Sequence, residues 1–170
     1  MLQPSIIVTI SENFDSDTIG KLSNFSINGN STSTTVFFEF KDFLYKLEQS
    51  DLNDCIVKKS QGILECIGEA ESQIHNVDMD SLVLHELGSL DTLIDVTCCV
   101  AGINELNLDF VYSSPLPTGS GTVMTEHGIT TVPAPVTMSI LSKFNVPLNP
   151  PPGANTDTGE MVTHTGAVFL

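Results

Sequence analysis

The spacing of the apolar residues between Phe40 and Leu106 constrains the fold of this chain more than any other feature. Apolar side chains recur there with a helical period, interrupted by polar residues at Ser50-Asp51. This pattern is typical of helices that bury one face. Pro135 suits the first turn of a further helix, because the N–H that proline lacks has no helical partner there. We expect helices over residues 40–50, 52–75, 88–106 and 134–144.

Short runs of β-branched and aromatic residues predict a few strands. Residues 108–113 (LDFVYS) form such a run, and Pro115 and Pro117 should end it because each lacks a backbone donor. Further strands are predicted over residues 5–10 and 122–125, and an extended loop over 147–153. The predicted fold class is α/β, a small mixed sheet packed with about four helices.

The chain is strongly acidic, with 21 Asp and Glu against 6 Lys and Arg and a formal net charge of −15 at pH 7. A field of that sign repels phosphate backbones and anionic head groups, so we expect no nucleic-acid partner and no membrane association. No apolar run approaches the roughly 20 residues that cross a bilayer, and residues 1–10 lack the basic start of a signal peptide. We therefore expect a cytoplasmic protein.

The four cysteines follow no CxxC spacing and are expected to be reduced thiols. Cys55 and Cys66 lie about three helical turns apart, which places both on one apolar helix face and predicts a core position for each. Cys98-Cys99 lies among apolar residues in the middle of a predicted helix, where a thiolate is disfavoured. No GxSxG motif is present, so a serine hydrolase of that type is excluded.

A group of metal-ligand residue types surrounds the start of the third predicted helix. His85-Glu86 precedes Gly88, and Asp91 and Asp95 follow on one side of the helix. One imidazole with several carboxylates can hold a divalent cation if the chain breaks at Gly88 and lets these groups converge. The plainer interpretation is that the carboxylates only complement the helix dipole.

Two segments rich in Gly and Thr could wrap an anion with their backbone N–H groups. They are Gly119-Ser120-Gly121 and Thr163-His164-Thr165-Gly166. Neither has the lysine or the spacing of a P-loop, and tight turns explain both equally well. The remaining histidines have plain interpretations: His127 and His164 as exposed turn residues, and His75 as a structural residue at a helix end, where a cation favours the dipole.

Four motifs occur in order along the chain: 84–95 (LHELGSLDTLID), 111–121 (VYSSPLPTGSG), His127-Gly128 with 132–135 (VPAP), and 159–167 (GEMVTHTGA). In these motifs the chain resembles the nickel-insertion proteins that complete the nickel-pincer nucleotide cofactor of lactate racemase. The resemblance covers roughly residues 36–170. It divides the chain into a divergent N-terminal segment, residues 1–35, and a domain over 36–170 that is similar to the N-terminal domain of the family.

The resemblance implies insertion of nickel into pyridinium-3,5-bisthiocarboxylic acid mononucleotide, in a CTP-dependent cyclometallation. Nickel accepts imidazole and carboxylate ligands, and on this basis we interpret His85, Glu86 and His127 as metal-side groups. Asp91 and Asp95 would orient these ligands or add to them. The residues interpreted as facing the phosphate of the nucleotide are Gly119, Ser120, Gly121, Thr163, Thr165 and Gly166.

The chain also departs from the family pattern. Phe37 and Glu39 stand where the family has the histidines of an HxH motif, and Val83 stands at the first histidine of its H-x-H-E-x-G motif. The opening Asp-Cys-Phe…Gly-Asp-Met motif is not found in residues 1–35, and His164 replaces the proline of a Thr-Pro-Thr-Gly motif. The second domain of the family, which is associated with CTP, is not found in the sequence, so CTP is expected to bind a separate domain or subunit.

Three functions stay open at this point. The first is nickel insertion together with a separate CTP-binding partner. The second is a degenerate, non-catalytic homologue that binds a divalent metal or a phosphorylated ligand, which the replaced histidines favour. The third is an acidic interaction domain, which the retained His85, Glu86, Asp91 and Asp95 disfavour.

Overall fold

The computed structural model describes residues 39–84, 90–125, 128–151, 153 and 157–170. Its helices are α2 (Phe40–Glu48), α3 (Asp54–His75), α4 (Leu90–Glu105), α5 (Pro135–Lys143) and α6 (His164–Ala167), with a 3-10 helix, η1, at Met79–Ser81. Its strands are β1 (Leu116–Pro117), β2 (Thr122–Thr125), β3 (Gly128–Thr131) and β4 (Leu148–Asn149). The expected helices over 40–50, 52–75, 88–106 and 134–144 are confirmed as α2 to α5.

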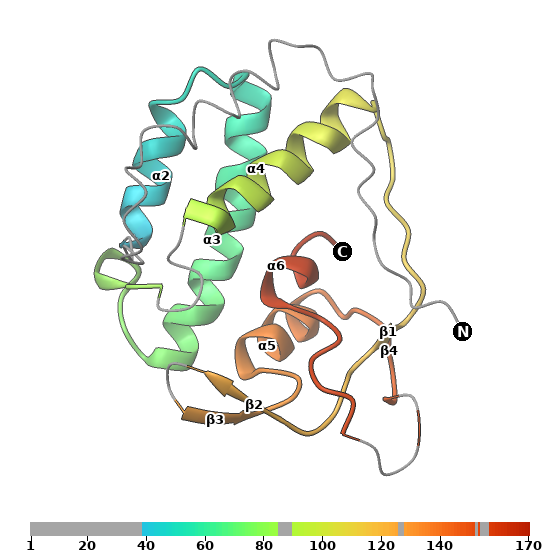
Figure 1. Cartoon of the computed structure of the whole chain (residues 1–170). Helices are drawn as coiled ribbons and strands as arrows, with labels where there is room; N and C mark the ends of the chain where they lie inside the picture. Colours follow the sequence, from blue (N-terminus) through green and yellow to red (C-terminus); the bar gives the residue numbers. More distant parts are fainter. Residues whose placement is uncertain (1–38, 85–89, 126–127, 152, 154–156) are drawn as a thin grey trace.

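Helix α3 is the centre of the fold, and α2, α4 and α5 all pack against it (Figure 1). Its buried stripe recurs every three to four residues, as an amphipathic helix requires. The fully buried side chains of the core come from one face of each packed helix, and include Phe43, Leu47, Leu64, Ile67, Leu93, Val96, Ile140 and Leu141. Helix α6 packs against α4 and α5, so the C-terminal segment also joins this core.

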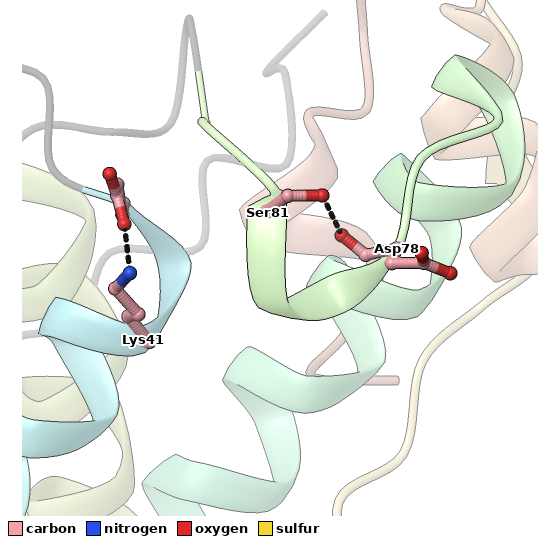
Figure 2. A network of polar contacts seen from close by, with 4 residues as sticks. Lys41, Asp78 and Ser81 are labelled. Atoms are coloured by element: carbon pink, nitrogen blue, oxygen red, sulfur yellow. Dashed lines mark hydrogen bonds and ion pairs between the residues drawn. The ribbon is translucent and has the colours of Figure 1, made fainter.

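The ends of α3 are set by two asparagines. The side chain of Asn53 accepts a hydrogen bond from the Cys55 N–H at 2.8 Å and caps the first turn. Asn76, in the left-handed conformation with φ of 53°, ends the helix. The expected break near Ser50-Asp51 is confirmed, but the cap is Asn53, because α3 begins only at Asp54. Beyond α3, Ser81 donates a hydrogen bond to the Asp78 carbonyl at 3.1 Å and closes η1 (Figure 2).

The strands form two separate two-stranded sheets. β1 pairs with β4 in parallel, with Leu116 opposite Leu148. β2 pairs with β3 as an antiparallel hairpin, with Thr122 opposite Thr131. The α/β fold class is therefore confirmed, with parallel and antiparallel pairing both present, and the expected strand over 122–125 is β2.

Two expectations about the chain after α4 are wrong. Residues 108–113 form no strand: Phe110 and Tyr112 are 74% and 87% exposed, and no partner strand lies beside them among the described residues. The strand lies instead at Leu116–Pro117, paired with β4 inside the segment expected to be a loop. Pro117 is tolerated there because its neighbours supply the donors, Leu116 N–H to Pro147 O at 2.9 Å and Thr118 N–H to Asn149 O at 3.1 Å.

The predicted core position of Cys55 is also wrong. Cys55 is exposed and its Sγ donates to Asn104 Oδ1 at 3.5 Å, while Cys66 is half-buried. The buried stripe of α3 passes through Ile56 and Ile67, one residue later than each cysteine, so Cys55 lies outside the core whereas Cys66 packs against the edge of it. All four cysteines are free thiols, as expected. Within the described parts of the chain, no helix has the length and apolar character needed to cross a membrane.

Candidate functional site

A cavity of about 180 Å³ lies where α3 ends, the hairpin β2–β3 turns, and α5 and α6 begin. Its polar lining residues are Glu71, His75, Thr125, Thr130 and His164. Its apolar lining residues are Ile74, Ile129, Ala134, Pro135 and Val136. Three parts of the sequence therefore place two imidazoles, one carboxylate and two hydroxyls around one space: the end of α3, the hairpin with the start of α5, and the start of α6.

The best-defined polar contact in this cavity joins Glu71 and His75, one turn apart on α3. His75 Nε2 lies 3.1 Å from Glu71 Oε2, and the two side chains are 28% and 11% exposed. His75 is the last residue of α3, as expected, but it also lines the cavity. The spacing of Glu71 and His75 by four residues is the sequence signal for this pair, because residues four apart are neighbours on a helix face.

The second imidazole of the cavity belongs to His164, the first residue of α6. The sequence predicted an exposed turn residue, and this is wrong, because His164 is half-buried and lines the cavity. Thr163 caps α6: its hydroxyl accepts a hydrogen bond from the Gly166 N–H at 3.1 Å. The expected phosphate-facing segment is thus the first turn of a short helix, with Thr165 half-buried within it.

The predicted metal-side residues His85, Glu86 and His127 lie outside the described residues. His127 directly precedes Gly128, where β3 begins, and Thr125 at the end of β2 lines the cavity. Over the described ranges, no three His, Cys, Asp or Glu side chains form a cluster that could hold a metal ion.

Asp91 and Asp95 are both exposed, one turn apart on α4, and neither is among the described residues that line the cavity. Partial burial raises the pKa of Asp95, and the charge of Asp91 raises it further. Burial also raises the pKa of the Cys98 and Cys99 thiols, with the charge of Asp95 adding to both. The expectation that a thiolate is disfavoured at Cys98-Cys99 is confirmed.

The segment 119–121 is hydrogen-bonded to residues 157–159 and packs closely against them. Ser120 and Gly159 form an isolated antiparallel bridge, with the Gly159 N–H donating to Ser120 O at 3.0 Å. The Ser120 hydroxyl also lies 3.2 Å from the Thr158 hydroxyl. Gly121 has a φ of 99°, and a Cβ added there would collide with the Asp157 carboxylate. A phosphate at Gly121 would therefore meet a negative charge.

Over residues 10–170, the chain matches the model of a family described as nickel insertion protein. The chain belongs to the nickel insertion protein family. The match includes residues 10–35 as well as the segment in which the motifs occur. No solved structure matches the chain.

Similar proteins from other organisms are also named as nickel insertion proteins. A relative from Dictyoglomus thermophilum is 41% identical over 130 residues, which are 76% of this chain and 32% of the relative. Several relatives, including the following two, bear the name pyridinium-3,5-bisthiocarboxylic acid mononucleotide nickel insertion protein. The one from Thermotoga sp. (strain RQ2) is 39% identical over 71% of this chain and 29% of the relative. The one from Staphylococcus saprophyticus is 34% identical over 76% and 32%. The matched segment thus spans about a third of the length of these relatives.

Two positions at which the resemblance implies histidines lie side by side in this chain. Glu39 and Val83 form an isolated antiparallel bridge, and the Phe40 N–H donates to Leu82 O at 3.0 Å. Glu39 is exposed and pairs with Lys41, whose contact is drawn as a dashed line in Figure 2. The hydrogen bond with Glu39 raises the pKa of Lys41. This member therefore has a carboxylate and an isopropyl group where the resemblance implies two imidazoles.

Proposed function

We propose that this chain takes part in the insertion of nickel into pyridinium-3,5-bisthiocarboxylic acid mononucleotide, in the cytoplasm, for the lactate racemase cofactor. Membership of the nickel insertion protein family and the names of two relatives support this proposal. We include CTP dependence in the proposal, with CTP bound by a separate domain or subunit. Nickel is the cargo of this reaction, and the pyridinium nucleotide is its acceptor.

Membership of the nickel insertion protein family is the observation that carries the proposal. Imidazole and carboxylate groups suit nickel, but Glu71, His75 and His164 only border one space beside the hairpin and do not form a cluster that could hold a metal ion. We propose that His85, Glu86 and His127 supply metal-side groups and that Asp91 and Asp95 support them. His127 follows the end of β2 by two residues, and Thr125 at that end lines the cavity.

We propose two neighbouring segments as candidates for binding the phosphate of the nucleotide. A Cβ added at Gly119 would lie 3.2 Å from the Met161 nitrogen, so the segment 119–121 packs close to the chain that leads into α6. The Asp157 carboxylate beside Gly121 disfavours an anion at that glycine. We therefore expect the phosphate nearer to Thr163, Thr165 and Gly166 than to Gly121.

Nickel titration calorimetry at neutral pH tests the proposed metal-binding residues. The wild type is compared with His85→Ala and His127→Ala, and Asp51→Ala serves as a control for the exposed acidic surface. We expect micromolar binding, about −8 kcal/mol, that is lost in both histidine variants and kept in the control. Heat that is absent, or that does not change in the histidine variants, contradicts the assignment of these residues.

A second candidate function is a non-catalytic homologue that binds a divalent metal or a phosphorylated ligand. The bridge between Glu39 and Val83 favours it, because two implied metal ligands are replaced at adjacent positions. An insertion assay separates the two functions: the chain is mixed with nickel, CTP, the pyridinium nucleotide and the remaining part of a longer relative. Formation of the nickel-containing nucleotide, measured by mass spectrometry, supports insertion. Nickel binding without product supports the second function.

A further inference from the structure

The chain between α4 and β1 is exposed along its whole length, although it is rich in apolar residues. Figure 1 shows it, in yellow, as a long trace along one side of the molecule. Residues 105–115 are all exposed. The large apolar side chains among them are those of Leu106, Leu108, Phe110, Val111 and Tyr112. So many exposed apolar side chains in one short stretch are typical of a surface that another molecule covers.

The backbone of the same stretch also lacks partners. The Leu108 N–H donates to Ile103 O at 3.3 Å, and Asn149 Nδ2 donates to Pro115 O at 3.5 Å. Between these two contacts, the backbone of residues 109–114 makes no hydrogen bond within the described part of the chain. Unpaired N–H and C=O groups on an extended chain form an edge to which another strand can add.

The side chains of the stretch alternate as they do in a strand. The ring centroids of Phe110 and Tyr112 lie 6.1 Å apart, close to the roughly 6.6 Å by which a strand advances over two residues. Leu108 precedes Phe110 at the same spacing, while Asp109 and Ser113 fall at the alternate positions. The stretch therefore has one apolar face, which a second strand with an apolar face can extend.

The sequence of this stretch is complementary to itself. When two copies are aligned antiparallel around Val111, Phe110 of each copy stands directly opposite Tyr112 of the other. Aromatic pairs at directly opposite positions stabilise a pair of strands. The same register places Asp109 opposite Ser113, so the two aspartates do not face each other. A second copy of this chain thus supplies a strand that matches the exposed one.

The charge pattern also favours a second copy over a basic partner. Asp109 is the one charged residue of the sequence 106–118, in a chain with a net charge of −15. Two copies therefore meet with little repulsion at this stretch, whereas a basic partner is attracted more strongly to the acidic surfaces elsewhere. Repulsion between the rest of the two copies is screened by salt.

We propose that residues 108–113 are a dimerisation strand, which pairs antiparallel with the same residues of a second copy around Val111. This inference is independent of the proposed function, because it uses no residue of the candidate site. A contact of six residues per copy is smaller than the roughly 20–30 residues per partner of a stable interface. The dimer is therefore weak, with a dissociation constant on the order of 10–100 µM.

Sedimentation equilibrium of the full chain, under reducing conditions, tests the association. The chain concentration is varied from about 5 to about 500 µM, around the expected dissociation constant, at about 0.15 M and about 0.5 M NaCl. We expect only monomer and dimer, with association about threefold tighter at the higher salt concentration, because salt screens the repulsion between acidic copies. A monomer at all concentrations, species larger than a dimer, or weaker association at high salt overturns the proposal.

Two lysine substitutions test the register of the pairing. Ser113→Lys places an ammonium group opposite Asp109 of the other copy, twice in each dimer. Ser114→Lys is its control, because it changes the net charge equally but stands opposite Leu108. We expect the Ser113→Lys dimer to be about threefold to tenfold tighter than the Ser114→Lys dimer. Equal affinities overturn the pairing around Val111.

A further matched pair tests the aromatic contact. Tyr112→Ser removes both aromatic pairs of the dimer, and Ile129→Ser is its control, because Ile129 is also a strongly exposed apolar residue, on β3. We expect the dissociation constant to rise at least about tenfold in Tyr112→Ser and to stay unchanged in Ile129→Ser. Both side chains are exposed, and circular dichroism checks that both variants fold. A folded Tyr112→Ser variant with wild-type affinity overturns the proposal.

Hydrogen exchange measured by mass spectrometry at low and high chain concentration identifies what covers the strand. If a second copy covers it, the protection of the backbone amides of residues 109–114 increases with concentration. Protection that does not depend on concentration shows that another part of the same chain covers the strand, and this result overturns the proposal. Absence of protection at both concentrations also overturns it.

Discussion

The ring of Phe40 lies against Gly68, so that α2 and α3 meet at a residue without a side chain. A Cβ added at Gly68 would lie 2.8 Å from Phe40 Cζ and 2.9 Å from Met79 Cε. These distances are shorter than van der Waals contact, and both neighbours belong to elements packed on α3. Gly68 is thus a packing requirement of the core, in the middle of a helix where glycine otherwise lowers helix propensity.

We predict that Gly68→Ala lowers the free energy of unfolding by about 1–3 kcal/mol, because the added methyl group forces Phe40 or Met79 to move. Urea denaturation followed by circular dichroism measures the change. Gly62→Ala on the same helix is the control, since no atom lies within 4 Å of its added Cβ. It should raise the free energy of unfolding by about 0.5–1 kcal/mol. Equal effects of the two substitutions would contradict the close packing at Gly68.

Thr137 on α5 presents a second testable feature, a buried hydroxyl with no hydrogen-bond partner in the described structure. We predict that Thr137→Val raises the free energy of unfolding by about 1 kcal/mol, because valine has nearly the same shape without the unsatisfied polar group. Thr97→Val is the matched control: Thr97 is also buried, but its hydroxyl donates to Leu93 O at 2.7 Å. Thermal melts of both variants measure the difference. A melting temperature for Thr137→Val at or below that of the wild type would sink the prediction.

The helices could be predicted because each one buries a periodic apolar face, as Phe43 and Leu47 of α2 do. Strand β2 could also be predicted, but β1 and β4 could not, because their positions depend on pairing partners distant in sequence. Residues 108–113 have a high β propensity but form no strand in the structure, whereas Leu116–Pro117 pairs with Leu148–Asn149, 32 residues later. For the same reason the cavity was not predicted, since His75 and His164 are brought together only by the packing of α3, α5 and α6.

The pair Asp91 and Asp95 predicts a pH dependence of stability. The raised pKa of Asp95 means that the folded state binds its proton more tightly than the unfolded state does, so this residue lowers stability as the pH rises past about 4. We predict that Asp95→Asn raises the melting temperature at pH 7, because it removes a partly buried charge and its repulsion from Asp91. At pH 3, where the raised pKa keeps the Asp95 carboxyl group protonated, the two proteins should melt at nearly the same temperature. If Asp95→Asn raised the melting temperature more at pH 3 than at pH 7, the predicted direction of the pH dependence would be wrong.

Glu39 and Val83 allow a gain-of-function test of the metal proposal. Residues directly opposite one another in an antiparallel pair have Cβ atoms about 4.5–5.5 Å apart, so two histidines placed there can share one metal ion. We predict that the double variant Glu39→His/Val83→His binds nickel at least about tenfold more tightly than the wild type in titration calorimetry. Each single variant should gain less than the double variant, and Glu39→Gln should gain nothing. If the effects of the single variants add up to that of the double variant, the two histidines form two independent weak sites instead of one shared site. An unchanged nickel affinity in the double variant would show that positions 39 and 83 take no part in nickel binding.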